Sequence, residues 1–289
     1  MRSSLKNTLF PQQNIDLLVM YLLRIIAAFV GVIVVFILVF LMMESMPVLN
    51  QVGLLAFLTN DSWNPGDKLY NLTPMLVSTV FVVAGAVVVA TPLGILSALF
   101  CHYYAPEKIA HFYRRLMELL AGVPGVVYGF WGLMVLIPLI NRWHPPGSSL
   151  LAGILMLTLL IMPTIALIAD ASFAGIADEY LHGAISLGLT RSGTIFSLIL
   201  PIARSELLMG IILATGRALG ETMIVLMVCG NIVQIPDSLF APIRTLPANI
   251  ALEMDFALGN HRSALFVSGL LLMAISLVLV LLAEAIKDN

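Results

Sequence analysis

Charged residues are scarce in this chain of 289 residues, where Asp, Glu, Lys and Arg together make up 10%, against about 25% in ordinary soluble domains. Hydrophobic residues make up 60%, and the mean hydropathy is +1.04. This composition excludes an ordinary soluble protein and a disordered one. Several uncharged stretches reach the length of about 20 residues that crosses a hydrocarbon core, so the sequence predicts an all-α polytopic membrane protein.

Several chemical signals are missing as well. Cys101 and Cys229 stand alone in apolar sequence, and the five histidines lack the spacing of a metal site. No glycine is followed by lysine, so the chain lacks the loop that holds nucleotide phosphates. A net charge of -2 gives no basic field for nucleic acid. We expect no metal, no cofactor bound by this chain and no nucleic-acid partner, and we find no nucleophile with a base that would make it an intramembrane enzyme.

Apolar segments between charges predict six membrane spans. The first is interpreted as a retained helix and not as a signal peptide, because its apolar run is too long and no small-residue cleavage site follows it. No linker divides the chain, which predicts one transmembrane domain over 1–289 in contact with membrane lipid. The expected spans are 25–43, 74–100, 119–140, 150–169, 207–233 and 264–283.

The basic residues set the expected orientation. Cytoplasmic segments of membrane proteins carry an excess of Lys and Arg. One side of the predicted topology holds Arg2, Lys6, Arg24, Lys108, Arg114, Arg115, Arg191, Arg204 and Lys287, and the other holds only Lys68, Arg142, Arg244 and Arg262. Both termini are therefore predicted to be cytoplasmic, in agreement with an even number of spans.

The cytoplasmic connection 170–206 is long and helical in pattern. Asp178 can cap a helix, and Gly188 can end it. Leu181, Ala184, Ile185 and Gly188 fall at the spacing of one helical face, so we expect a short amphipathic helix outside the membrane. Its apolar face has three possible neighbours, which are the membrane interface, other parts of this chain and a groove on a partner protein.

The same connection carries a family pattern. The segment 182–201, HGAISLGLTRSGTIFSLILP, resembles the EAA loop of ABC importer permeases, with His182 in place of the usual glutamate. The matching positions are Gly183, Ala184, Gly188, Leu200 and Pro201. The resemblance implies that the short helix lies in a cleft of an ATP-binding subunit and transmits its closing motion to the membrane helices.

Three further segments narrow the resemblance. ELLAGVPGVVYGFWGL at 118–133, GRALGETMIV at 216–225 and APIRTLPANIALEM at 241–254 resemble phosphate importer permeases of the PstC type, and the Trp-Asn-Pro at 63–65 is a weaker match. The similarity extends from about residue 50 to the end of the chain. It implies a type I ABC importer permease in the bacterial plasma (inner) membrane that takes up phosphate. A permease for molybdate, tungstate or sulfate, and a membrane scaffold or sensor, are the alternatives.

The resemblance also implies partners. These are a second permease subunit of the PstA type, two copies of an ATP-binding subunit of the PstB type, and an external phosphate-binding protein of the PstS type. ATP and Mg would then be used by the partner ATPase and not by this chain. Alternating access is the mechanism expected of such a complex.

Two charges interrupt the fifth predicted span. Arg217 and Glu221 are four residues apart, which predicts one helix face shared with Gly210 and Ala214. Each ionisable group within a membrane span costs about 2.5 to 3.5 kcal/mol on insertion scales, so we expect the pair to have a structural or functional role. A guanidinium matches the oxygens of phosphate, and the resemblance assigns both residues to the substrate path. We hypothesise that Glu221 pairs Arg217 when the path is empty, whereas the simpler alternative is an ion pair that only holds helices together.

Two other features have structural interpretations. Gly122, Gly125, Gly129 and Gly132 with Pro124 are typical of close helix packing and a kink. Arg244 lies in an outer loop, where it either receives an anion or is an ordinary solvated charge.

Overall fold

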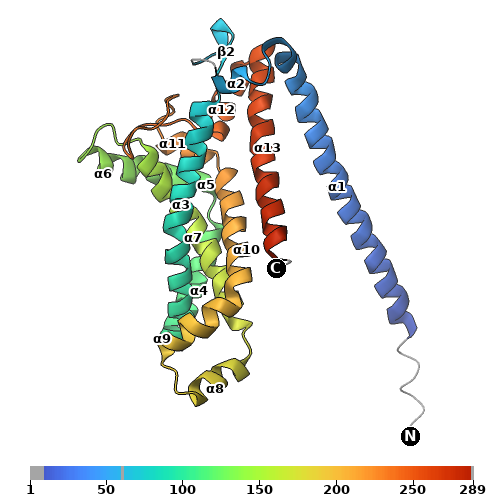
Figure 1. Cartoon of the computed structure of the whole chain (residues 1–289), viewed down its shortest axis with the longest axis vertical. Coiled ribbons are helices and arrows are strands. Elements are labelled where there is room, and N and C mark those ends of the chain that lie inside the picture. The colour runs from blue at the N-terminus through green and yellow to red at the C-terminus, as the bar shows by residue number, and fades with distance from the viewer. Residues whose placement is uncertain (1–9, 60–61, 288–289) are drawn as a thin grey trace.

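The computed structural model describes residues 10–59 and 62–287, which form a helical bundle with one small hairpin (Figure 1). Among these residues, five helices are long and apolar enough to cross a membrane, and one bent helix pair makes a sixth span when it is counted as one. This result confirms the predicted all-α membrane fold of about six spans. The spans are Asp16–Val52, Thr73–Tyr104, Glu107–Gly122 with Gly125–Asn141, Leu150–Ala174, Arg191–Leu219 and Asn260–Ala285.

The described residues form six long and seven short α-helices. The long α-helices are α1 (Phe10–Val52), α3 (Thr73–Leu99), α4 (Glu107–Gly122), α7 (Leu150–Ala174), α10 (Leu200–Leu219) and α13 (Asn260–Lys287). The short ones are α2 (Ala56–Thr59), α5 (Gly125–Trp131), α6 (Ile137–Asn141), α8 (Asp178–Ser186), α9 (Arg191–Thr194), α11 (Met223–Val228) and α12 (Leu246–Glu253). Three π-helical segments, η2 (Phe100–Tyr104), η3 (Gly132–Leu136) and η4 (Ile195–Ile199), and two 3-10 turns, η1 (Pro65–Asp67) and η5 (Met254–Phe256), complete the helical elements of the described chain.

The core consists of three apolar clusters that follow one another along α3. An outer cluster contains Met75 and an inner cluster contains Leu99, with Val82 and Ala86 in the middle cluster between them. The middle cluster joins α3 to α7, and glycines bring these two helices into close contact. A Cβ at Gly94 would lie 2.8 Å from Ile165 Cγ2, too close for any larger residue without movement of its neighbours.

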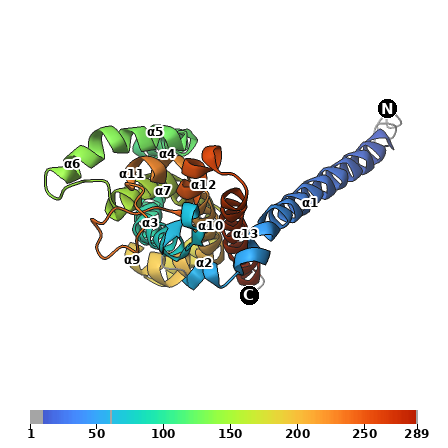
Figure 2. The same ribbon diagram turned by 90° about the horizontal axis from the view of Figure 1, so that it is seen from above.

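Helix α1 is longer than its predicted span 25–43. At 1.5 Å per residue its 43 residues extend roughly 64 Å, about twice the thickness of a hydrocarbon core. Only its outer part is fastened to α13, where Phe40 meets Phe266 edge to face and Glu44 lies 3.9 Å from Arg262. The inner part points away from the bundle (Figures 1 and 2).

The outer end of the bundle carries the hairpin. Strands β1 (Trp63–Asn64) and β2 (Leu69–Tyr70) are antiparallel, with Trp63 opposite Tyr70. Both of these aromatic side chains pack on the outer cluster. Helices α1 and α13 have their free ends on the side away from this hairpin, which is also the side of α8 (Figure 1). The cytoplasmic assignment of that side remains a prediction.

The third span is not the straight helix predicted over 119–140. Helices α4 and α5 meet at an angle of 95°. The cause is Pro124, which forces the preceding residue out of the helical region, and Val123 accordingly has φ -69° and ψ 130°. The predicted kink is confirmed, but it is sharp enough to divide the span into two helices.

The predicted fifth span, 207–233, is wrong in its bounds. The membrane helix begins at Arg191 and ends at Leu219, and the chain then breaks before the short helix α11. Arg204 and Glu206 fall within the predicted connection 170–206, yet they lie exposed on the first turns of α10. The part of 170–206 that lies outside long helices is therefore shorter than expected, and α8 lies within it.

Helix α5 and the following segment η3 pack on α11 through glycines. A Cβ at Gly129 would lie 3.2 Å from the Ile224 Cα, and one at Gly132 would lie 2.9 Å from Val228 Cγ1. Gly125, Gly129 and Gly132 therefore have the expected packing role. Gly122 differs, because a Cβ there would meet nothing within 4 Å.

We expect Gly129→Ala to lower the free energy of unfolding by about 1–3 kcal/mol, because the new methyl group meets backbone atoms of α11 that cannot move independently. Thermal unfolding of the detergent-solubilised protein measures the effect. Gly122→Ala is the matched control, with an expected change within about 0.5 kcal/mol. Equal stability of both variants would contradict the packing role of Gly129.

Candidate functional site

Arg217 lies in the last turn of α10 and bridges two other helices. Its Nη1 donates to Thr164 Oγ1 of α7 at 3.0 Å, and its Nη2 donates to the Ala121 carbonyl of α4 at 3.1 Å. Ala121 belongs to the final turn of α4, where backbone carbonyls lack intrahelical partners. The guanidinium thus supplies a donor, and a positive charge, to the negative end of a helix dipole.

Both acceptors of Arg217 are neutral. Among the described residues, Arg217 takes part in none of the ion pairs. The predicted pair with Glu221 is therefore absent from this structure. Only two of the guanidinium N–H groups are used, and the positive charge remains without a carboxylate beside it.

Glu221 has a different position from the one predicted. Helix α10 ends at Leu219 with Gly220 as its C-cap, so Arg217 and Glu221 do not share a helix face. The Glu221 Oε1 accepts a hydrogen bond from the Ile224 backbone N–H at 3.1 Å. Its carboxylate also lies against Gly125, where a Cβ would stand 2.7 Å from Oε1. A negative charge at the starts of α5 and α11 is favourable, because helix dipoles have their positive ends there.

Gly210 and Ala214 occupy the expected stripe beside Arg217. Both are buried, and a Cβ at Gly210 would lie 2.8 Å from Ile168 Cγ2 of α7. On the side of the Arg217–Thr164 contact that faces α8, α7 and α10 border a cavity of about 700 Å³. Its lining includes Ile168 and Leu213, each one helical turn from Thr164 and Arg217 respectively. The cavity thus begins one helical turn from the Arg217–Thr164 contact, between the same two helices.

The predicted amphipathic helix is present as α8. Asp178 lies in its first turn, but the N-cap is Ala177 and makes no side-chain hydrogen bond, so the expected Asp178 cap is wrong. Gly188 ends the helix as expected, with φ +75°, and the Leu189 N–H donates to the Ala184 carbonyl. This is the hydrogen-bond pattern of a glycine C-cap.

The residues of the EAA-like loop divide into an exposed and a buried group. His182, Gly183, Gly188 and Pro201 are exposed, whereas Ala184 is buried and Leu200 is partly buried. Leu181 of α8 and Leu200 of α10 pack against the same inner cluster, which also contains Leu99 and Phe173. The Ile185 side chain of α8 is 69% exposed, and that of Leu187, directly after the helix, is 82% exposed. One face of α8 thus joins this chain, and the other has no partner among the described residues.

The outer loops contain a polar network that the sequence did not reveal. Arg244 Nη1 donates to Glu253 Oε1 at 2.6 Å, and the second oxygen, Oε2, accepts from Trp63 Nε1 at 2.9 Å and lies 2.8 Å from His261 Nε2. Arg244 Nη1 also donates to Asn249 Oδ1 at 3.2 Å. These side chains join β1, α12, α13 and the loop before α12. Arg244 is therefore a structural residue here, not a solvated loop charge.

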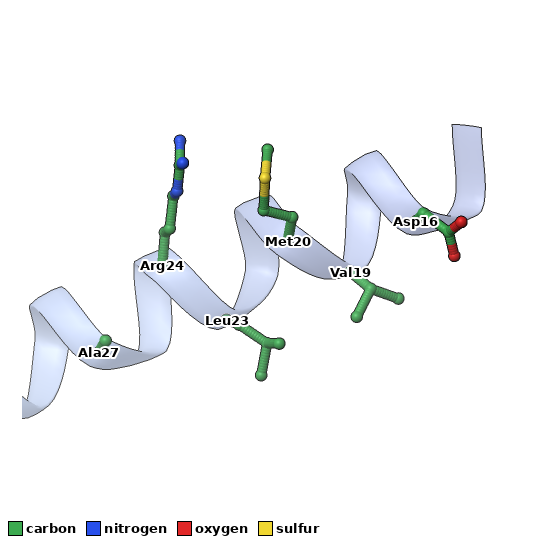
Figure 3. A pocket seen from close by; sticks show the side chains of 6 residues that line it. All are labelled: Asp16, Val19, Met20, Leu23, Arg24 and Ala27. Carbon is green, nitrogen blue, oxygen red and sulfur yellow. The ribbon is translucent and has the colours of Figure 1, made fainter. Parts of the chain in front are cut away.

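A shallow hollow at the start of α1 is lined by residues of that helix alone, and their side chains point in different directions (Figure 3). Within the described part of the chain, no group of three or more His, Cys, Asp or Glu side chains could hold a metal ion.

Comparison with known proteins identifies the family. Residues 90–288 match the family described as "Binding-protein-dependent transport system inner membrane component". The chain is 35% identical to the probable ABC transporter permease protein YqgH of Bacillus subtilis, over 83% of this chain and 80% of that protein. It is 34% identical to the phosphate transport system permease protein PstC of Mesorhizobium japonicum, over 79% of this chain and 77% of that protein.

A solved structure supports the fold independently of close sequence similarity. A chain of a bacterial alginate ABC transporter, in complex with an alginate pentasaccharide-bound periplasmic protein, superposes with a TM-score of 0.64 at 15% identity. The match covers 91% of this chain and 94% of that chain.

We expect Glu253→Gln to lower the free energy of unfolding by about 1–3 kcal/mol, because Arg244 and His261 would lose a charged acceptor in a largely buried position. Thermal unfolding of the purified protein measures this change. Glu44→Gln is the control, since the Glu44–Arg262 pair is longer and more exposed and should contribute at most about 0.5 kcal/mol. Equal effects of the two substitutions would show that the network does not hold the outer loops together.

Proposed function

Because the chain belongs to the family of binding-protein-dependent transport system inner membrane components, we propose that it is the membrane-spanning permease subunit of an ATP-driven importer of inorganic phosphate. The choice of phosphate is supported by relatives that are named phosphate transport permeases and are aligned over most of this chain. The observation that carries the proposal is the position of Arg217, a membrane-embedded guanidinium held by neutral acceptors and therefore able to attract an anion.

In this proposal, Arg217 contacts the anion during its passage. A guanidinium offers planar pairs of N–H donors that match phosphate oxygens, and burial in a low-dielectric region strengthens the attraction. A single arginine suits transport better than a cluster of several, because the ion must also leave.

Glu221 belongs to the same part of the path in this proposal, but with a changed role. Its hydrogen bond to the start of α11 and its contact with Gly125 fix the two helix breaks to each other. Its negative charge also limits how strongly a phosphate is bound nearby. Glu221 thus holds the α4–α5 break and the α10–α11 break together. It also keeps phosphate from binding too tightly to leave the path.

Energy would come from partner subunits. We propose that the exposed face of α8, with His182, Gly183, Ile185 and Leu187, docks in a groove of an ATP-binding subunit of the PstB type. Two copies of that subunit, a second permease of the PstA type and an external phosphate-binding protein of the PstS type complete the complex. ATP and Mg would be bound and used by the ATP-binding subunits, with the whole complex in the bacterial plasma (inner) membrane.

The inner cluster supplies a route for the motion. Leu181 and Leu200 pack on it together with residues of α3 and α7, so a displacement of α8 is transmitted to three membrane helices. Approach of the two ATP-binding subunits would tilt the helices to an outward-open state, and their separation after hydrolysis would return the inward-open state. A permease for molybdate, tungstate or sulfate would use the same geometry.

Uptake of labelled phosphate tests the substrate. In phosphate-starved bacteria that lack only this chain, we expect expression of the chain to restore uptake, and excess molybdate, tungstate or sulfate to leave that uptake unchanged. Restoration that a competitor abolishes would assign another oxyanion. Absence of uptake while the ATP-binding subunit copurifies with the chain would contradict a transport role.

Substitution of Arg217 tests the site. We expect Arg217→Lys to lower the rate of phosphate uptake about tenfold, because a point charge replaces a planar donor pair, and Arg217→Gln to lower it about a hundredfold. Copurification of the ATP-binding subunit should be unchanged. Arg204→Gln, on the exposed start of α10, is the matched control. Wild-type uptake by Arg217→Gln would exclude a direct contact with the anion.

A further inference from the structure

Thr164 uses its hydroxyl group differently from three other threonines in the membrane helices, Thr79, Thr158 and Thr215. Thr79, Thr158 and Thr215 each donate to the backbone carbonyl four residues earlier, at 2.7 Å in all three cases. This back-bonding is the usual arrangement of a helical threonine in an apolar environment. The hydroxyl of Thr164 makes no such bond within the described chain and instead accepts one from Arg217 Nη1 at 3.0 Å.

The hydroxyl proton of Thr164 therefore has no acceptor among the residues that the structure describes. A hydroxyl carries one donor and two acceptor positions, and the contact with Arg217 occupies an acceptor position only. Thr164 is partly exposed, and the neighbouring turn of α7 borders the cavity between α7 and α10. Its O–H is thus an unused donor beside an unneutralised cation.

The two acceptors of Arg217 also fix the guanidinium plane. Thr164 holds Nη1 from α7, and the Ala121 carbonyl holds Nη2 from α4. Because the two bonds come from different helices, loss of either one would free the long side chain to rotate. Neutral acceptors achieve this orientation without reducing the charge that attracts an anion.

We infer that Thr164 is a second contact for the transported anion: its oxygen positions Arg217, and its O–H donates to an oxygen of the same phosphate that Arg217 binds. The inference rests on the proposed function. It extends the anion site from α10 to α7, so that the site has one charged and one neutral donor. Hydrogen bonds to a charged group are the stronger class, so loss of this one should be measurable.

The test uses the complete transporter with its binding protein, reconstituted in vesicles, and measures phosphate uptake and ATP hydrolysis in the same sample. Thr164→Val keeps the shape of the side chain and removes the hydroxyl. We expect uptake per ATP hydrolysed to fall roughly tenfold, because hydrolysis continues while the anion is poorly held. Thr164→Ser restores the hydroxyl and should restore at least half of the wild-type ratio.

Thr158→Val is the matched control, since Thr158 lies on the same helix but bonds only to backbone carbonyls. Its ratio should equal that of wild type. If Thr164→Val fails to assemble, Thr164→Ala replaces it with the same expected fall. A wild-type ratio in the assembled Val or Ala variant, or an equal loss in the Ser variant, would overturn the role of Thr164.

Arg217→Gln in the same vesicles separates the two proposals. Suppose that Arg217→Gln impairs uptake while Thr164→Val keeps the wild-type ratio of phosphate uptake to ATP hydrolysis. This result would overturn the role of Thr164 alone. Normal uptake by Arg217→Gln would overturn the proposed anion contact itself, and with it the reason for a second contact.

Discussion

The constraint that shapes this molecule is that a backbone group within a membrane must find a partner inside the protein. Two helices break at membrane depth, after Gly122 and after Leu219, and each break leaves carbonyl and amide groups without helical partners. The two charged side chains nearby supply some of these partners: Arg217 donates to the Ala121 carbonyl, and Glu221 accepts from the Ile224 amide. The free-energy cost of placing these charges in the bundle is thus offset by their hydrogen bonds to backbone groups at the two helix breaks.

This arrangement explains why a positive and a negative group four residues apart do not neutralise each other. Each lies at a helix end whose dipole has the opposite sign. The Arg217 guanidinium is therefore held by neutral acceptors, and the Glu221 carboxylate is held by a backbone N–H group at the start of α11. Separation of the two charges is a result of the break at Gly220, which puts them on different segments of the chain.

Much of the fold followed from composition and periodicity. The predicted spans 74–100, 150–169 and 264–283 agree with the structure, since long apolar runs without internal breaks report directly on membrane helices. The predicted span 207–233 failed because hydropathy averages over a window and does not register a break at Gly220. The helix α8 was recognisable from the spacing of Leu181, Ala184 and Ile185.

Contacts between distant segments were beyond the reach of one sequence. The only signal for Thr164 was a hydroxyl residue directly after a proline in an apolar span, and nothing in the sequence connected it with Arg217. The bonds of Glu253 to Trp63, Arg244 and His261 likewise depend on how β1, α12, α13 and the loop before α12 fold together.

The glycine contact between α5 and α11 has a mechanical consequence. Gly129 lies against backbone atoms of Met223 and Ile224, and Gly132 lies against the side chain of Val228, so α5 and α11 have little room to slide past each other and are expected to move together. Rotation is left to the non-helical residues at 123–124 and 220–222, which act as paired hinges. Turning at the first hinge would carry the end of α4 away from α7, and Arg217 could not then keep both of its acceptors. If Arg217 contacts the anion as proposed, opening of the bundle and weakening of that contact would be one motion.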